Sequence, residues 1–131
     1  MSSRKSNPEA WFGKAQQDMQ VAELLLAEKV VLTEIVCYHS QQCAEKSLKG
    51  FLVSRRIAFK FSHDLVYLIK LCSETDATFT QLLDAAARLS AAAQDVRYPI
   101  DEDLEPPSID IARSAVEYAK SVVAFVRARL Q

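Results

Sequence analysis

The chain has 131 residues, of which half are apolar and a quarter are charged, and its formal net charge at pH 7 is −1. This length and composition indicate one soluble globular domain. The charge balance shows no basic excess of the kind that marks nucleic-acid-binding proteins, although it leaves room for a local basic face. No apolar run approaches the roughly 20 residues that cross a bilayer, and the N-terminal MSSRKSNPEA lacks the apolar segment of a signal peptide. We therefore expect a cytoplasmic protein without a membrane-spanning segment.

The cysteines and the acidic run give no sign of a metal site. Cys37, Cys43 and Cys72 are odd in number and have no C-x-x-C spacing, which is typical of reduced, buried thiols. The acidic segment 101–105 is expected to be a solvated loop, because no carboxylate elsewhere is tied to it by spacing. We predict neither a metal nor a cofactor.

The first half of the chain predicts two long helices, since only two glycines and four prolines interrupt the whole sequence. Asn7 suits the N-cap of the first helix and Pro8 its first position, where a missing N–H costs nothing. The second helix is predicted over about residues 32–53. Within it, Gly50 weakens the helix by about 1 kcal/mol relative to Ala, and it also leaves space for another backbone to approach.

The second half predicts one short and two long helices. Ser62 is the expected cap of the short helix. The next helix is expected to start at Thr78, with Gln81 completing a capping box, and to stop at Pro99. The last begins at about Ser108, where apolar residues recur at alternating three- and four-residue steps.

The predicted fold is all-α: an antiparallel up-and-down four-helix bundle with an additional short helix. It forms a single domain over residues 1–131 with its core at about 8–130. On the last helix, Ile111, Val122 and Phe125 lie beyond a one-sided core and suggest a second apolar face, which self-association would cover.

Four segments give the chain a family resemblance. They are the first-helix residues Trp11, Ala15, Asp18 and Ala22, the stretch YHSQQCAEKSLK at 38–49, SHDL at 62–65, and RYP at 97–99. In this order they resemble the HEPN domain of prokaryotes, from about residue 8 to the end of the last helix. The resemblance implies a helical bundle similar to the helical domain of kanamycin nucleotidyltransferase.

What the resemblance implies about function is broader than one activity. Stand-alone HEPN proteins are often made alongside a small nucleotidyltransferase, as two-component toxin–antitoxin modules. Many are metal-independent endoribonucleases whose site is an arginine, four to six residues and a histidine, assembled across a dimer. Others have lost that motif and bind nucleotides or serve as interaction modules.

The ribonuclease motif departs from the family pattern at its catalytic position. Arg97 stands where the family places its arginine, but no histidine follows it, and carboxylates at 101–103 would repel a phosphate. Arg56 and His63 satisfy the spacing formally, yet they lie between the second and third helices. His63 would also need an orienting partner, and Asp64 is adjacent in sequence. We assign no catalytic residue, and Arg97 and His63 remain as weak candidates.

Polar side chains along the second helix have two interpretations. Glu45 and Lys49 suit an i, i+4 pair worth a few tenths of a kcal/mol, with His39 and Gln42 at its boundary. Alternatively the stripe lines a groove, where Gln42 contacts a base edge and Lys46 and Lys49 meet phosphates. Arg97 likewise either complements a helix C-terminus beside Asp95 or binds phosphate next to Tyr98. The predicted ligand-binding residues are Gln42, Glu45, Lys46, Lys49, Arg97 and Tyr98.

The resulting hypothesis is a non-nucleolytic HEPN-domain protein, homodimeric and cytoplasmic. It would bind a nucleotide or phosphate and act as the partner of a small nucleotidyltransferase in a toxin–antitoxin-like module. Two alternatives stay open. One is a metal-independent endoribonuclease toxin acting on RNA, through Arg97 with an unusual base or through Arg56 with His63. The other is a pure dimerisation or interaction module.

Overall fold

The structure is a computed structural model that describes residues 7–97 and 105–130, with side chains for all of these except 94–97. Its elements are α1 (Pro8–Leu26), α2 (Thr33–Ser54), α3 (Leu65–Ser73), the 3₁₀ helix η2 (Ala77–Leu82), α4 (Leu83–Arg97) and α5 (Ile109–Arg127). The described residues form no strand, so the predicted all-α class is confirmed. No helix within this part of the chain is both long and apolar enough to cross a membrane.

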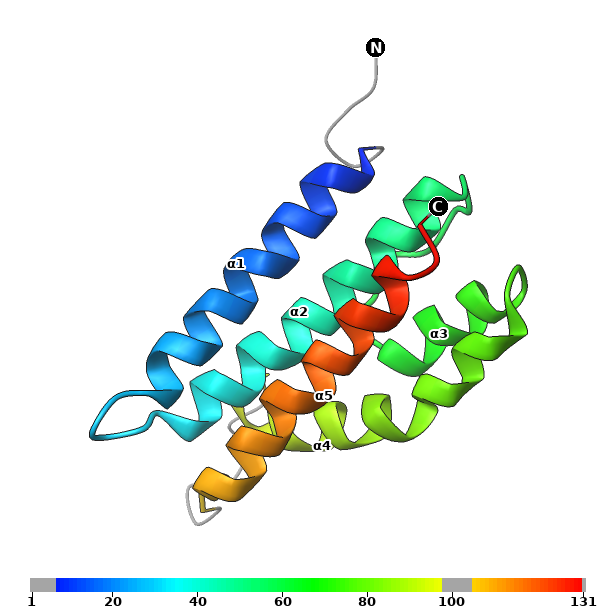
Figure 1. Cartoon of the computed structure of the whole chain (residues 1–131). Helices are drawn as coiled ribbons and strands as arrows, with labels where there is room; N and C mark the ends of the chain where they lie inside the picture. Colours follow the sequence, from blue (N-terminus) through cyan, green and yellow to red (C-terminus); the bar gives the residue numbers. More distant parts are fainter. Residues whose placement is uncertain (1–6, 98–104, 131) are drawn as a thin grey trace.

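The second helix is the centre of the bundle (Figure 1). α2 packs against α1, α3, α4 and α5, and the long helices that follow one another in the chain run in opposite directions. α1 rests mainly on α2 and touches α5 much less, although both lie alongside α2. The predicted up-and-down bundle is therefore confirmed, and no residue of α2 is exposed.

Two of the predicted helix starts are confirmed atom by atom. Asn7 Oδ1 accepts a hydrogen bond from the Glu9 amide at 3.0 Å, directly before Pro8. Ser108 Oγ accepts one from the Ile111 amide at 3.1 Å and caps α5. Both caps satisfy backbone donors that have no partner inside the helix.

Two other predicted starts are wrong by a few residues. Asp64, not Ser62, caps α3: its Oδ1 accepts from the amide of Val66 at 3.0 Å, while Ser62 Oγ accepts from the Asp64 amide. Likewise Asp76 Oδ1 accepts from the Thr78 amide at 3.0 Å, so the turn begins as 3₁₀ helix before Thr78, and the α-helix begins only at Leu83. In each case a carboxylate outcompetes a nearby hydroxyl as the cap.

The last helix contributes more to the core than its pattern predicted. Val122 is 1% exposed, and the ring of Phe125 packs on Phe79 with centroids 5.0 Å apart. Phe79 in turn packs on Phe51 at 4.5 Å. Of the three residues that suggested a second apolar face, only Ile111 is exposed, at 48%. That face is thus mostly interior, because α5 touches α2 on one side and α4 on another.

The glycine in α2 makes room for a ring. A Cβ on Gly50 would overlap Cε1 of the Phe12 ring on α1. The close approach expected at this glycine is therefore made by a side chain and not by another backbone. It helps α1 pack tightly on α2.

Candidate functional site

The polar residues of α2 divide into two groups, and the first one joins α2 to α1. Asp18 of α1 is 7% exposed. Its Oδ1 accepts from His39 Nδ1 at 2.8 Å and its Oδ2 from Lys46 Nζ at 2.6 Å. The carboxylate is thus shared between an imidazole and an ammonium, which offsets the cost of burying it.

The second group is centred on Glu45 and is buried more deeply. Glu45 Oε2 accepts from Lys49 Nζ at 2.9 Å, and Oε1 accepts from His63 Nδ1 at 3.0 Å. Only 3% of the Glu45 side chain and 4% of the Lys49 side chain are exposed. Gln41 Nε2 donates to the His63 carbonyl at 3.1 Å, and Gln42 Nε2 donates to Gln41 Oε1 at 2.9 Å. These contacts hold the connection between α2 and α3 against α2.

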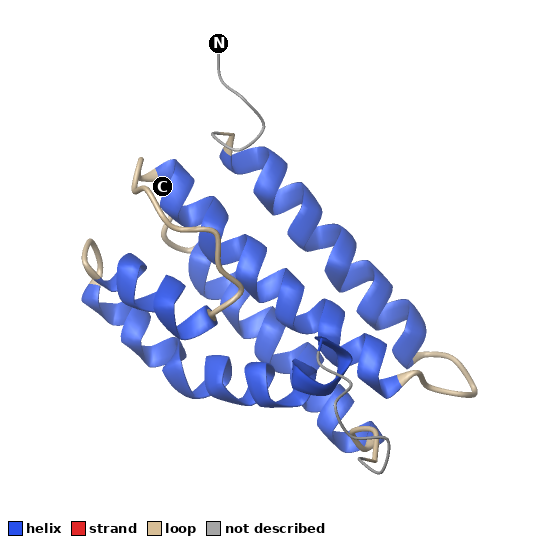
Figure 2. Cartoon of the chain, turned by 180° about the vertical axis from the view of Figure 1, so that it is seen from behind, coloured by secondary structure: helices blue, strands red, loops and turns tan. Residues whose placement is uncertain are grey.

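Aromatic rings enclose the Lys49 ammonium on its remaining sides. Its Nζ lies 5.6 Å from the ring centroid of Trp11, 5.9 Å from that of Phe59 and 5.6 Å from that of Phe61. Two of these rings belong to the extended connection between α2 and α3, which crosses the bundle in the view from behind (Figure 2). Ring faces attract cations by about 0.5 to 2 kcal/mol each, depending on desolvation. A buried lysine is tolerated here because one carboxylate and several rings replace water.

Glu45 is the orienting partner that His63 would need for proton transfer. The carboxylate binds Nδ1, which leaves Nε2 free for another contact, and 43% of the His63 side chain is exposed. Phe61, which is 88% exposed, lies edge-on to the imidazole with centroids 5.2 Å apart. A buried carboxylate behind an imidazole is the arrangement that positions a histidine for proton transfer. Asp64, the neighbour in sequence, is occupied instead as the cap of α3.

The three cysteine thiols are not in the reactive thiolate form at neutral pH. Burial raises the pKa of Cys43 and of Cys72 to about 12 and that of Cys37 to about 11. All three are free and buried, as predicted, and they are protonated at neutral pH. In the described part of the chain no three His, Cys, Asp or Glu residues come close enough together to hold a metal ion.

Comparison with known proteins places this geometry in a family. The sequence model of the HEPN domain matches residues 8–129. The chain belongs to the HEPN domain family. Its fold is similar to the crystal structure of an archaeal HEPN homologue, with a TM-score of 0.75 over 95% of this chain and 98% of that one. Because the two sequences are 24% identical, this likeness shows the HEPN fold and no more. A search of curated proteins gives no match.

Among the predicted ligand-binding residues of this HEPN domain, the two lysines of α2 face different elements. Lys46 faces α1 and pairs with Asp18, whereas Lys49 faces the connection between α2 and α3 and pairs with Glu45. Gln42 is 7% exposed and lies beside Glu45. The i, i+4 pair of Glu45 and Lys49 is present as one interpretation predicted, but it is buried and not on the surface.

The family's arginine position lies at the edge of the described structure. Arg97 is the last residue of α4, and its side chain is outside the described set. Tyr98 and the acidic residues 101–103 lie outside it as well. The assignment of Arg97 and Tyr98 to a ligand therefore stays a prediction.

The formally matching pair Arg56 and His63 has a structural explanation on the arginine side. Arg56 has a φ of 57° and stands just past the end of α2. The amide of Ile57 donates to the Leu52 carbonyl at 2.9 Å, and that of Arg56 to the Val53 carbonyl at 3.1 Å. These two bonds form a Schellman motif, in which the residue after the cap takes the left-handed conformation. Arg56 thus serves to end a helix.

Proposed function

We propose that this HEPN protein binds a nucleotide or phosphate without cleaving RNA, and that it is the partner of a small nucleotidyltransferase in a toxin–antitoxin-like module. The observation that carries the proposal is the absence of an imidazole after Arg97. The chain has two histidines, His39 and His63, and both precede Arg97. An arginine alone can hold a phosphate, but it cannot shuttle the protons that ester cleavage needs.

Among the proposed ligand contacts, the structure supports different roles for different residues. We assign Arg97 to the phosphate and Tyr98 to the ring of the ligand. Lys46 keeps 26% of its side chain exposed while bound to Asp18, so it can also approach a phosphate. Gln42, Glu45 and Lys49 act as positioning residues, because they are buried and bound to one another.

The protein is further proposed to act as a cytoplasmic homodimer. Ile111 remains exposed at the start of α5 and is a candidate contact. The partnership predicts that the neighbouring gene encodes a small nucleotidyltransferase, and co-purification with that protein tests it. A complex that survives size exclusion supports the proposal, and separate elution of the two proteins contradicts it.

Nucleotide binding and RNA cleavage are tested on the same preparations. Titration calorimetry with ATP and GTP is expected to give binding that Arg97→Ala abolishes and that Arg113→Ala, an exposed arginine on α5, leaves intact. Incubation with total RNA is expected to give no specific cleavage. If no nucleotide binds or raises the melting temperature, the protein is an interaction module instead.

The Glu45–His63 pair favours one second candidate, a metal-independent endoribonuclease. Nε2 of His63 would act as the base, and the Glu45 carboxylate, 3.0 Å from Nδ1 of His63, would hold the ring in place. Cleavage of RNA in the presence of a chelator, lost in His63→Ala but retained in His39→Ala, would establish this activity and overturn the first proposal.

A further inference from the structure

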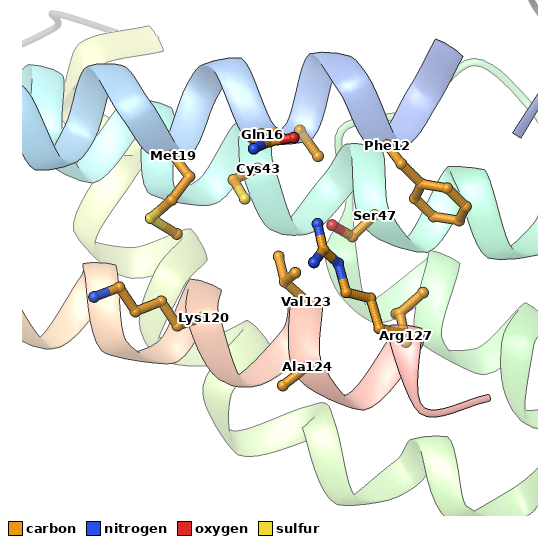
Figure 3. A pocket seen from close by; sticks show the side chains of 11 residues that line it. Phe12, Gln16, Met19, Cys43, Ser47, Lys120, Val123, Ala124 and Arg127 are labelled. Carbon is orange, nitrogen blue, oxygen red and sulfur yellow. The ribbon is translucent and has the colours of Figure 1, made fainter. Parts of the chain in front are cut away.

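A cavity of about 240 Å³ opens between α1, α2 and α5 (Figure 3). Cys43 and Ser47 of α2 form its floor, Phe12 and Met19 of α1 form one wall, and Val123 of α5 forms the other. It exists because α1 and α5 each pack on α2 but touch one another only sparsely. We call it the α1/α5 cavity.

Apart from Gln16 on α1 the walls are apolar, and the two charged lining residues, Lys120 and Arg127, both belong to α5. Lys120 Nζ is 3.8 Å from Glu23 Oε1 and 3.7 Å from Glu117 Oε1, so carboxylates already surround it. The side chain of Arg127 has neither an ion pair nor a hydrogen bond within residues 7–97 and 105–130, and Figure 3 shows its guanidinium turned toward α2 across the cavity. Burial dominates the raised pKa of the Cys43 thiol, but the charge of Arg127 is among the influences that oppose the rise. The positive charge of Arg127 therefore reaches Cys43 on the cavity floor electrostatically.

We propose that the α1/α5 cavity binds a small amphipathic anion, a monocarboxylate with a compact apolar body. The carboxylate binds Arg127, whose planar guanidinium offers two parallel donors to such a group. The body lies against Phe12, Met19 and Val123. An apolar cavity of about 150 Å³ accommodates benzene, so one of 240 Å³ accommodates a body of roughly eight carbons.

The wall chemistry selects against a nucleotide in this cavity. Between Phe12, Met19 and Val123 a base would have mainly apolar neighbours. Gln16 and Ser47 could pair with only some of its donors and acceptors, and each group left without a partner would cost about 1 to 3 kcal/mol. The proposal is thus independent of the proposed function, and none of its residues belongs to the predicted nucleotide set.

Titration calorimetry with octanoate, and with octanamide as an uncharged probe of the same length, tests the proposal. Octanoate is expected to bind one to one at millimolar concentration or below and at least about tenfold more tightly than octanamide. Arg127→Gln should weaken octanoate binding about tenfold and leave octanamide binding unchanged, since this exposed arginine has no partner in the described structure to lose. Arg113→Gln removes the same charge elsewhere on α5 and should change neither.

A filling variant locates the ligand. Val123→Phe places a ring in the α1/α5 cavity from a half-buried position, and circular dichroism verifies that the bundle still forms. It should abolish binding of both probes. The proposal is overturned if octanoate does not bind at millimolar concentration, if octanamide binds equally well, if the two arginine variants behave alike, or if folded Val123→Phe binds octanoate normally.

Discussion

Replacing Glu45 with Gln should destabilise the protein far more than a change in one helical ion pair normally does. Glu45 binds both Lys49 and His63, and the side chains of Glu45 and Lys49 are 3% and 4% exposed. Breaking a buried pair by removing one partner costs about 3 to 5 kcal/mol, because the other charge stays buried. The Gln oxygen can still accept one hydrogen bond and three rings remain around the ammonium, so we expect a loss of about 3 kcal/mol in the free energy of unfolding.

Urea denaturation, followed by far-ultraviolet circular dichroism, measures this loss against a matched control. Asp84 and Arg88 form an i, i+4 pair of the same spacing on α4, but their side chains are 75% and 60% exposed. Asp84→Asn should have no measurable effect, because solvent screens such a pair. A double variant with Met at both Glu45 and Lys49 should recover at least half of the loss, since it leaves no unpaired charge. The reasoning is refuted if Glu45→Gln is as mild as Asp84→Asn, or if the double variant loses the sum of its two single variants.

Three further predictions concern stability. Gly50→Ala should destabilise the native protein, because the new Cβ meets the Phe12 ring. In a Phe12→Ala background the same substitution should stabilise the protein by about 1 kcal/mol through helix propensity. A double-mutant cycle in urea measures both changes in the free energy of unfolding, and equal changes in the two backgrounds would contradict the contact. Burial raises the pKa of Cys72 from its ordinary 9.0 to about 12, so the unfolded state loses its proton first and stability falls above pH 9 by about 1.4 kcal/mol per pH unit for this thiol. Cys72→Ala should flatten the measured slope by that amount, and an unchanged slope would rule out the shift. Arg56→Gly should raise the melting temperature, since a left-handed backbone costs a non-glycine residue about 1 kcal/mol; a lower melting temperature would show that the arginine side chain matters more.

The helices of this HEPN domain could be predicted because their signals are local. Asn7 with Pro8, and Ser108 before an apolar seam, each act within one helical turn. Prediction was wrong where two local signals compete within a few residues. Asp64 and Asp76 each stand within two residues of the hydroxyl that was expected to cap, and the carboxylate is the stronger acceptor for backbone amides.

The candidate site was less predictable because its contacts cross between elements. Glu45 and His63 are 18 residues apart and meet only through the path of the α2–α3 connection. Lys46 and Lys49 differ by a single turn of helix, yet one faces α1 and the other faces aromatic rings. No spacing in the sequence states which neighbour each side of α2 receives. The prediction of a second, exposed apolar face on α5 was wrong for the same reason, because Val122 is buried inside the bundle.

The enclosure of α2 explains why it carries a line of charges through the middle of a small protein. A helix that touches four others has no free face, so its polar side chains must find partners on the elements that cover it. Asp18 on α1 and His63 on the α2–α3 connection are those partners, and they pair with Lys46 and Glu45 of α2. Buried polar pairs add little net stability compared with apolar packing, but they penalise misaligned arrangements. The charges of α2 therefore serve first to align α1 and the connection, and the phosphate binding that we propose would use cations that are not needed for this alignment.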